Sequence, residues 1–427
     1  MTNEATIAQS PVANRGWVVT FAGMGINLAL GVLYAWSVFK GKIGTDFGWE
    51  KERLNDPYAL CCLIFAFAMI LAGRCQDRFG PRVTATLGGL LVGVGFFIAS
   101  SSQNYWAWMI GFGLLAGTGI GFGYSSATPP ALKWFPPAKT GLIAGLVVAG
   151  FGLAPVYLAP LTKHLVGTSV LHAARIYSIA FAIAVVGLAQ LLKNPPTGYV
   201  AAPAAVGGGA KPAIGSATAG QMLRSPTFYL LWIIYFVGAG AGLMVISSVN
   251  GMAAKSMGEL AFVAVAVLAI GNAAGRIGAG LLSDKIGRRW TLMLVLLLQA
   301  ALMFLAIPAT ASAGTAAAVI VLVAACIGAN YGANLSLFPS FTKDLWGLRS
   351  FGVNYGIVFT AWGVGGFVLS RLQQTLTARS AGSYTVSFVT AGLLLVVGAA
   401  LTLLIKPLAR ITTAAARPEP KLETAQK

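Results

Sequence analysis

The chain has 427 residues, of which 57% are hydrophobic and only 9% are charged. A soluble globular domain carries about 25% charged residues, so this composition excludes a protein whose whole surface faces water. The net charge of +18 does not indicate nucleic-acid binding, because the basic residues lie in short segments between long apolar runs. We therefore expect an integral membrane protein.

The N-terminal segment, residues 1–16, is polar and lacks the basic and apolar regions of a secretory signal peptide. Twelve apolar runs follow, each long enough to cross a hydrocarbon layer of about 30 Å. The expected spans are 17–39, 57–73, 82–101, 104–130, 140–162, 173–193, 227–250, 259–282, 289–309, 314–340, 351–375 and 384–406.

A Pro-, Gly- and Ala-rich stretch at 194–225 separates six of these spans from the other six and is predicted to be a linker. The expected fold is an all-α membrane protein of twelve transmembrane helices in two pseudo-symmetric six-helix halves. The halves are predicted at 17–193 and 226–406, with a tail at 407–427.

Lysine and arginine are distributed unevenly between alternate loops. If both termini are cytoplasmic, 19 of the 29 basic residues fall in cytoplasmic segments and 9 fall in outer segments. Positive charge is enriched in cytoplasmic loops. We therefore expect both termini inside, in a multi-pass protein of the cytoplasmic (inner) membrane.

Two similar loop sequences indicate an internal duplication. GRCQDRFGPR follows the second span and GLLSDKIGRR follows the eighth, which places Asp77 and Asp284 207 residues apart. Tyr124 and Tyr331 are separated by the same 207 residues. Duplicated halves commonly place the substrate at their interface near the middle of the membrane.

The charges of the two loops are expected to form a conformational latch between the halves. The alternative is a set of solvated loop charges, which contribute little. The predicted latch residues are Asp77, Arg78, Arg82, Asp284, Lys285 and Arg288.

Arg276 is the clearest cation inside a predicted span, eight residues before Asp284. A charge at that depth costs several kcal/mol unless it is paired or faces water, although an arginine near a helix end can also reach the interface. Because a guanidinium matches a carboxylate bidentately, the predicted cargo is a small organic anion. Asn272 lies one turn earlier on the same face. The other candidates for the substrate site are Tyr124, Tyr331, Trp362, Leu28, Asn330 and Asn334.

The twelve spans, the central linker and both loop motifs resemble the major facilitator superfamily, which works by alternating access. Within it, segments 15–39 and 133–155 and the span-eight arginine followed by SDKIGR resemble monocarboxylate transporters and bacterial oxalate:formate exchangers. The resemblance implies transport of a small monocarboxylate with proton symport.

Two departures from these relatives bear on the mechanism. Asn272 stands where animal monocarboxylate transporters carry an aspartate, and Trp362 stands where the oxalate:formate exchanger carries a second cation. One cation matches one carboxylate, so lactate-like or pyruvate-like cargo is favoured over oxalate.

None of the eleven carboxylates lies deep in a predicted span, so proton coupling would have to use a group near a span end. Asp46, Asp56 and His164, near the outer ends of spans, are the candidates for proton coupling. We expect proton symport, with organic-anion exchange of the oxalate:formate type as the alternative and a transporter-like receptor as a remote one.

No Ser–His pair, His-rich motif or pair of carboxylates falls within a predicted span. We therefore expect no enzymatic activity, no cofactor and no metal site. The expected partners are an L-lactate-like anion, a proton and membrane lipid, without nucleic acid, and the carrier is expected to function as a monomer.

Overall fold

A computed structural model of the protein describes residues 14–50, 53–196, 199, 217–246, 261–311, 317–380 and 383–405. Most of the predicted linker at 194–225, nearly all of the predicted tail at 1–16 and the whole of that at 407–427 lie outside these residues. The regular elements of the described part are all helical, and twelve helices are long and apolar enough to cross a membrane. The predicted twelve-helix fold is confirmed.

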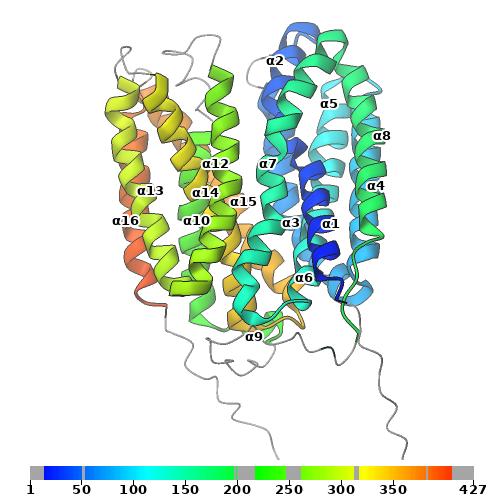
Figure 1. The fold of residues 1–427 in the computed structure, drawn as a ribbon. Coiled ribbons are helices and arrows are strands. Elements are labelled where there is room, and N and C mark those ends of the chain that lie inside the picture. The colour runs from blue at the N-terminus through cyan, green and yellow to red at the C-terminus, as the bar shows by residue number, and fades with distance from the viewer. Residues whose placement is uncertain are drawn as a thin grey trace, which may run out of the picture.

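The first six spans form one group of helices (Figure 1). The first span is broken near its middle, because α1 and α2 are joined by a short 3-10 stretch, η1. The bounds are α1 Gly16–Leu30, η1 Gly31–Ala35, α2 Trp36–Asp46, η2 Arg53–Asn55, α3 Asp56–Phe79, α4 Pro81–Ala99, α5 Tyr105–Trp108, η3 Met109–Ala116, α6 Gly117–Lys133, η4 Pro137–Lys139, α7 Thr140–Thr168 and α8 Val170–Ala189.

The second six spans form the other group (Figure 1). Their bounds are α10 Pro226–Ile246, α12 Ala261–Ile286, α13 Arg288–Ala311, α14 Ala317–Trp346, α15 Phe351–Arg379 and α16 Thr385–Thr402. A short helix, α9 (Ala219–Leu223), precedes them within the predicted linker segment. The start of α1, the end of α16 and α9 lie at the same end of the molecule, which is called the terminal end below (Figure 1).

Two helix pairs, α7 with α12 and α3 with α15, make most of the contact between the halves, and glycine lets each pair approach closely. A Cβ on Gly280 of α12 would lie 2.2 Å from the carbonyl oxygen of Gly141 of α7, and a Cβ on Gly73 of α3 would lie 2.2 Å from that of Gly352 of α15. A side chain at any of these positions would separate the helices. Gly73 and Gly280 are 207 residues apart, so the same contact occurs once in each copy of the duplicated unit.

Candidate functional site

A small cavity lies between the two halves. Its volume of about 10 Å³ is comparable with the roughly 10–15 Å³ that one ordered water molecule needs. The described residues that line it are mostly aromatic and include one formal charge. The lining residues are Tyr34, Phe65, Tyr124 and Phe151 from the first half and Arg276, Tyr331, Leu335, Phe359 and Trp362 from the second.

Arg276 supplies that charge. It lies in α12, ten residues before the helix ends at Ile286, which is about 15 Å along the axis at 1.5 Å per residue. Its side chain has 0% exposed surface. Nε donates to the side-chain oxygen of Asn272 at 2.9 Å and Nη1 donates to the carbonyl of Val148. Nη2 makes no hydrogen bond of normal geometry within the described chain, although the hydroxyl of Tyr34 lies near the guanidinium. The guanidinium is therefore held by Asn272 and Val148, and Nη2 keeps a donor for a further partner.

Two glycines of α7 make room for this arginine. A Cβ on Gly152 would lie 3.2 Å from Nε of Arg276, and one on Gly145 would lie 2.4 Å from the arginine's carbonyl oxygen. The glycine-rich stretch that opens the fifth span therefore brings α7 against α12 at the depth of the guanidinium. This contact gives a physical reason for glycine at both positions.

Phenol and indole groups complete the polar lining. The hydroxyl of Tyr331 accepts from Nε1 of Trp362 at 2.8 Å and lies 3.3 Å from the hydroxyl of Tyr34. Tyr34 lies in the 3-10 stretch between α1 and α2, and its ring packs edge-on against Phe151 with centroids 5.4 Å apart. The hydroxyl of Tyr124 makes no hydrogen bond of normal geometry among the described residues, and it lies near the hydroxyl of Tyr355. The cavity therefore combines one cation with several neutral hydrogen-bonding groups.

At the terminal end, each half offers a carboxylate to the first turn of a helix in the other half. Asp77 of α3 accepts from the backbone N–H groups of Gly352 and Val353, both at 3.1 Å. We call these three residues the first clasp. The N-terminus of a helix carries partial positive charge and unpaired N–H groups, so a carboxylate stabilises this contact.

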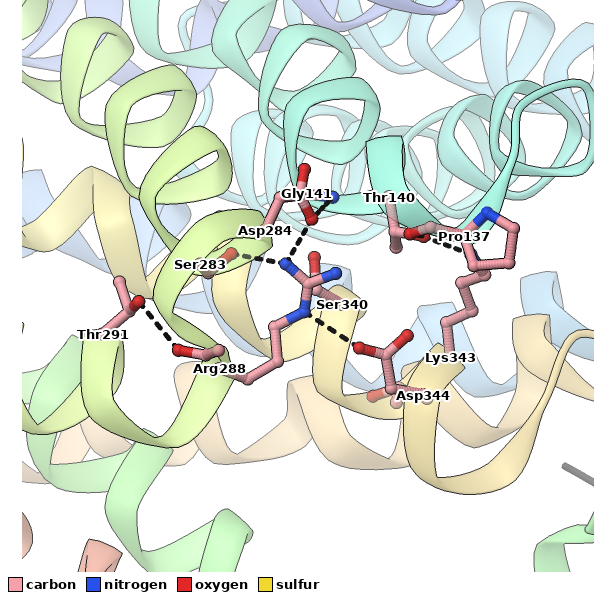
Figure 2. Close-up of polar contacts among 12 residues, drawn as sticks. Pro137, Thr140, Gly141, Ser283, Asp284, Arg288, Thr291, Ser340, Lys343 and Asp344 are labelled. Atoms are coloured by element: carbon pink, nitrogen blue, oxygen red, sulfur yellow. Dashed lines mark hydrogen bonds and ion pairs between the residues drawn. The ribbon is translucent and has the colours of Figure 1, made fainter. Parts of the chain in front are cut away.

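The second clasp consists of Asp284, Gly141 and Leu142. The carboxylate of Asp284 accepts from the N–H of Gly141 at 2.9 Å (Figure 2). It also accepts from the N–H of Leu142 at 3.0 Å. The two aspartates are 207 residues apart and their glycine partners are 211 apart. The two clasps are therefore equivalent contacts of the duplicated halves.

An ion-pair network reinforces the second clasp but not the first. Arg288 donates to Asp284 at 2.6 Å and to Asp344 at 2.9 Å, and it also reaches the hydroxyl of Ser283 (Figure 2). Asp77 makes no ion pair within the described part of the chain. The contact of Asp77 with α15 therefore depends on the N–H groups of Gly352 and Val353.

Comparisons with known proteins agree with this arrangement of two similar halves around a cavity. Residues 16–370 match the profile of the Major Facilitator Superfamily. The chain belongs to this superfamily. As a major facilitator it is a transporter and not an enzyme.

Three relatives cover most of this major facilitator. It is 29% identical to the uncharacterised MFS-type transporter YhjX of Escherichia coli K12, covering 82% of this chain and 85% of the relative. It is 28% identical to the oxalate:formate antiporter of Oxalobacter formigenes, covering 82% of each chain. It is 24% identical to monocarboxylate transporter 13 of Bos taurus, covering 92% and 89%.

A solved structure supports the fold. The transporter FucP in its outward conformation superposes with a TM-score of 0.69 at 14% identity, covering 92% of this chain and all of the other. At this identity the likeness concerns architecture alone.

The structure brings together five of the eight residues predicted for the substrate site of this major facilitator. Arg276, Tyr124, Tyr331 and Trp362 line the cavity, and Asn272 holds the guanidinium. Sequence reasoning missed five lining residues. Helical spacing could have predicted Phe359 and Leu335, because they lie one turn from Trp362 and Tyr331. No local sequence signal distinguished the other three. The missed residues are Tyr34, Phe65, Phe151, Leu335 and Phe359.

The other three predicted residues lie elsewhere. The carbonyl of Leu28 accepts from the hydroxyl of Tyr157 at 3.0 Å. The amides of Asn330 and Asn334 donate to carbonyls one turn earlier in α14, at 2.8 and 2.9 Å. None of the three lines the cavity.

The candidates for proton coupling lie at the end opposite the termini. Asp46 is paired with Lys42 at 3.0 Å, Asp56 accepts from the hydroxyl of Tyr105 at 2.8 Å, and His164 is exposed. None of them lines the cavity.

Three of the predicted latch residues do not join the clasps. Arg82 donates to the carbonyl of Leu192 at 2.9 Å, within its own half. The guanidinium of Arg78 lies 5.2 Å from the ring centroid of its neighbour Phe79, and Lys285 is exposed. Backbone N–H groups, rather than these basic side chains, are the common partners of the two aspartates.

Proposed function

We propose that this major facilitator carries a small monocarboxylate of the lactate or pyruvate type, bound by Arg276. The observation that carries the proposal is the free Nη2 donor of a fully buried guanidinium that lines the cavity between the halves. A buried charge without a counter-charge is costly, and a carboxylate supplies that charge with matching geometry. The hydroxyls of Tyr34 and Tyr331 supply further hydrogen bonds nearby.

The charge of the site favours one carboxylate over two. Among the described residues, Arg276 is the one charged residue that lines the cavity, and the other lining residues are aromatic or aliphatic. A second carboxylate would lose its hydration there without gaining a cation. The names of two relatives, a monocarboxylate transporter and an oxalate:formate antiporter, fit small carboxylates as a class.

Transport by alternating access requires the cavity to widen, because its present volume of about 10 Å³ is too small for a three-carbon acid. In the proposed cycle the two clasps hold the terminal end closed and release it when the halves rock. The distribution of lysine and arginine supports cytoplasmic termini in a bacterial inner membrane, which would place both clasps on the cytoplasmic side.

We propose proton symport as the coupling mode. Arg276 and a monocarboxylate form a neutral unit, which crosses a low-dielectric barrier at reduced cost. Anion exchange is the second candidate, because no carboxylate or histidine lines the cavity in the described structure and one relative is an oxalate:formate antiporter. In that mode a counter-anion, rather than a proton, would accompany the return of the carrier.

Uptake into proteoliposomes tests the proposal. We expect uptake of radiolabelled lactate or pyruvate, with inhibition by acetate and formate and little by oxalate. The variant Arg276→Ala should lose uptake, whereas Arg371→Ala, which removes an exposed guanidinium from α15, should retain it. Normal lactate uptake by Arg276→Ala would refute the assigned site.

The same vesicles separate the two coupling modes. Symport predicts that an inward proton gradient drives net uptake and that a protonophore abolishes it. Exchange predicts that uptake depends on internal counter-anion and persists with the protonophore.

A further inference from the structure

Each half carries two basic residues around the glycine turn that joins its second and third spans. Arg78 and Arg82 form the first basic pair, and Lys285 and Arg289 form the second. The same offset of 207 residues relates the two pairs. Arg289 is half-buried and the other three are exposed. The duplicated unit therefore presents two positive charges beside each clasp.

The carboxylate of each turn does not neutralise its basic pair. Asp77 precedes Arg78 and Asp284 precedes Lys285, but both carboxylates bind helix N-termini of the opposite half. None of the four basic residues forms an ion pair within the described part of the chain. The two charges of each basic pair are therefore available to an anion from outside the chain.

The arginine of each basic pair is fixed in the same way in both halves. Nε of Arg82 donates to the carbonyl of Leu192 at 2.9 Å, and Nη2 of Arg289 donates to that of Leu403 at 2.8 Å. These carbonyls directly follow the last spans of the halves, α8 and α16. Each arginine uses one nitrogen for this contact, and a guanidinium has five N–H donors. Both side chains are therefore held in place and keep donors for a ligand.

An exposed apolar stripe runs from each basic pair along the third span of its half. Each stripe has a residue at every third or fourth position, so it forms one face of its helix. The first stripe consists of Val83, Leu87, Leu90, Val94 and Phe97 in α4, and the second of Trp290, Leu294, Leu297, Ala301 and Phe304 in α13. Because both helices are membrane spans, the stripes lie against acyl chains.

The order of these groups along the membrane matches an anionic phospholipid. Its phosphate can accept charge-assisted hydrogen bonds from the basic pair, while its acyl chains cover the stripe. Trp290 heads the second stripe, with its ring centroid 5.4 Å from the guanidinium of Arg289, and tryptophan concentrates at the level of the headgroups. A water-soluble polyanion would contact the charges but leave the stripe uncovered. A zwitterionic headgroup would bring a positive amine to two cations.

We propose that each basic pair and its stripe bind one anionic phospholipid, so that the transporter holds two equivalent lipids at the terminal end. Basic pockets between membrane helices are suited to anionic headgroups. Each basic pair follows a clasp aspartate in the sequence, so a bound headgroup also steadies the turn that presents this aspartate. The inference does not depend on the proposed cargo.

Native mass spectrometry of the purified full-length protein tests the two sites. Phosphatidylglycerol and phosphatidylcholine with the same acyl chains are titrated into the detergent, and the dissociation constants of the first two binding events are compared. Each basic side chain near an anionic surface contributes about fivefold to affinity, so each site should prefer phosphatidylglycerol by about 25-fold. Excess glycerol phosphate should not displace the lipids, because it has no chains to cover the stripes.

Charge-removing variants should abolish the sites one at a time. Arg78→Gln with Arg82→Gln should lose one of the two lipids, and Lys285→Gln with Arg289→Gln should lose the other. The lipid that remains in each double variant shows that the protein is folded. Arg78→Lys with Arg82→Lys should keep both lipids, because it keeps both charges.

Arg371→Gln is the matched control and should also keep both lipids. It removes an exposed guanidinium beside the ring of Phe367, near the opposite end of α15 from the first clasp. Retention of both lipids in the two glutamine variants would overturn the inference, and so would equal affinity for the two phospholipids. Loss of a lipid in the lysine variant or in the control would do the same. Displacement by glycerol phosphate would assign the basic pairs to soluble phosphate instead of lipid.

Discussion

The unequal clasps predict that the two copies of the loop motif contribute unequally to closure of the terminal end. Asp284 accepts from Gly141 and Leu142 and pairs with Arg288 at 2.6 Å. Its side chain and that of Arg288 are only 10% and 11% exposed. Asp77 accepts two backbone hydrogen bonds but has no ion pair among the described residues, and it is exposed. Replacing Asp284 or Asp77 by asparagine should therefore lower the stability of the closed terminal end by different amounts.

Asp284→Asn should destabilise the closed terminal end by about 2–3 kcal/mol, which is roughly 30- to 150-fold in population. The substitution loses a charge-assisted hydrogen bond and the ion pair, and the new amide group faces backbone donors. Asp77→Asn should cost about 0.5–1 kcal/mol, or about two- to fivefold, because water already competes for the exposed carboxylate. Asp344→Asn removes one partner of Arg288 without touching the backbone contacts, so its effect should also be small.

Distances between spin labels across the terminal end measure these populations. Leu191 after α8 and Leu403 after α16 are exposed by 48% and 50% and lie in different halves, so cysteines at these positions in a background lacking the four native ones can carry the labels. We expect Asp284→Asn to add a longer-distance population and Asp77→Asn to add a smaller one. Equal shifts, or a larger shift for Asp77→Asn, would refute the ranking.

Three further predictions concern packing and the cavity. Gly280→Ala should impair closure of the terminal end and lower the melting temperature, because its Cβ would lie 2.2 Å from the carbonyl oxygen of Gly141. Gly278→Ala on the same helix is the control, because a Cβ there meets no atom within 4 Å. It should behave as the wild type in the spin-label and thermal assays. Tyr34→Phe removes the hydroxyl next to Tyr331 and should weaken lactate binding about 3- to 10-fold in calorimetry; unchanged affinity would exclude Tyr34 from the site. Gly152→Ala places a Cβ 3.2 Å from Nε of Arg276 and should weaken lactate binding without loss of folded protein. Wild-type affinity in this variant would show that the guanidinium can be displaced without affecting binding.

Long apolar runs made the helices predictable, because each span must satisfy its backbone hydrogen bonds within itself. Arg276 and Asn272 could also be identified from the sequence, because a charge within an apolar run has few explanations. The neighbouring Val148 carbonyl and Gly152 come from α7, more than a hundred positions away in the chain. No periodicity within one segment could pair them with Arg276.

The aromatic lining was less predictable for the same reason. Phe65 and Phe151 lie in runs where most residues are apolar, and only the packing of the halves turns them toward the cavity. Asp77 and Asp284 were recognised as a pair, and Arg288 is a basic partner of Asp284 as predicted, but the backbone donors that bind both carboxylates were not expected. Helix N-termini compete for the same carboxylates, and which helix starts beside a loop is a property of the assembled fold.

The duplicated halves differ where the cargo is proposed to bind. An offset of 207 residues relates Arg276 to Met69 and Arg288 to Pro81. The backbone around the first pair is conserved in geometry, since a Cβ on Gly145 would lie 2.4 Å from the carbonyl oxygen of Arg276 and one on Gly356 would lie 2.5 Å from that of Met69. The fold thus offers two equivalent positions and places a cation at one of them. A site with the symmetry of the fold would hold two cations and suit a dicarboxylate, whereas this asymmetry leaves one charge and an opposing wall of neutral groups, as a monocarboxylate requires.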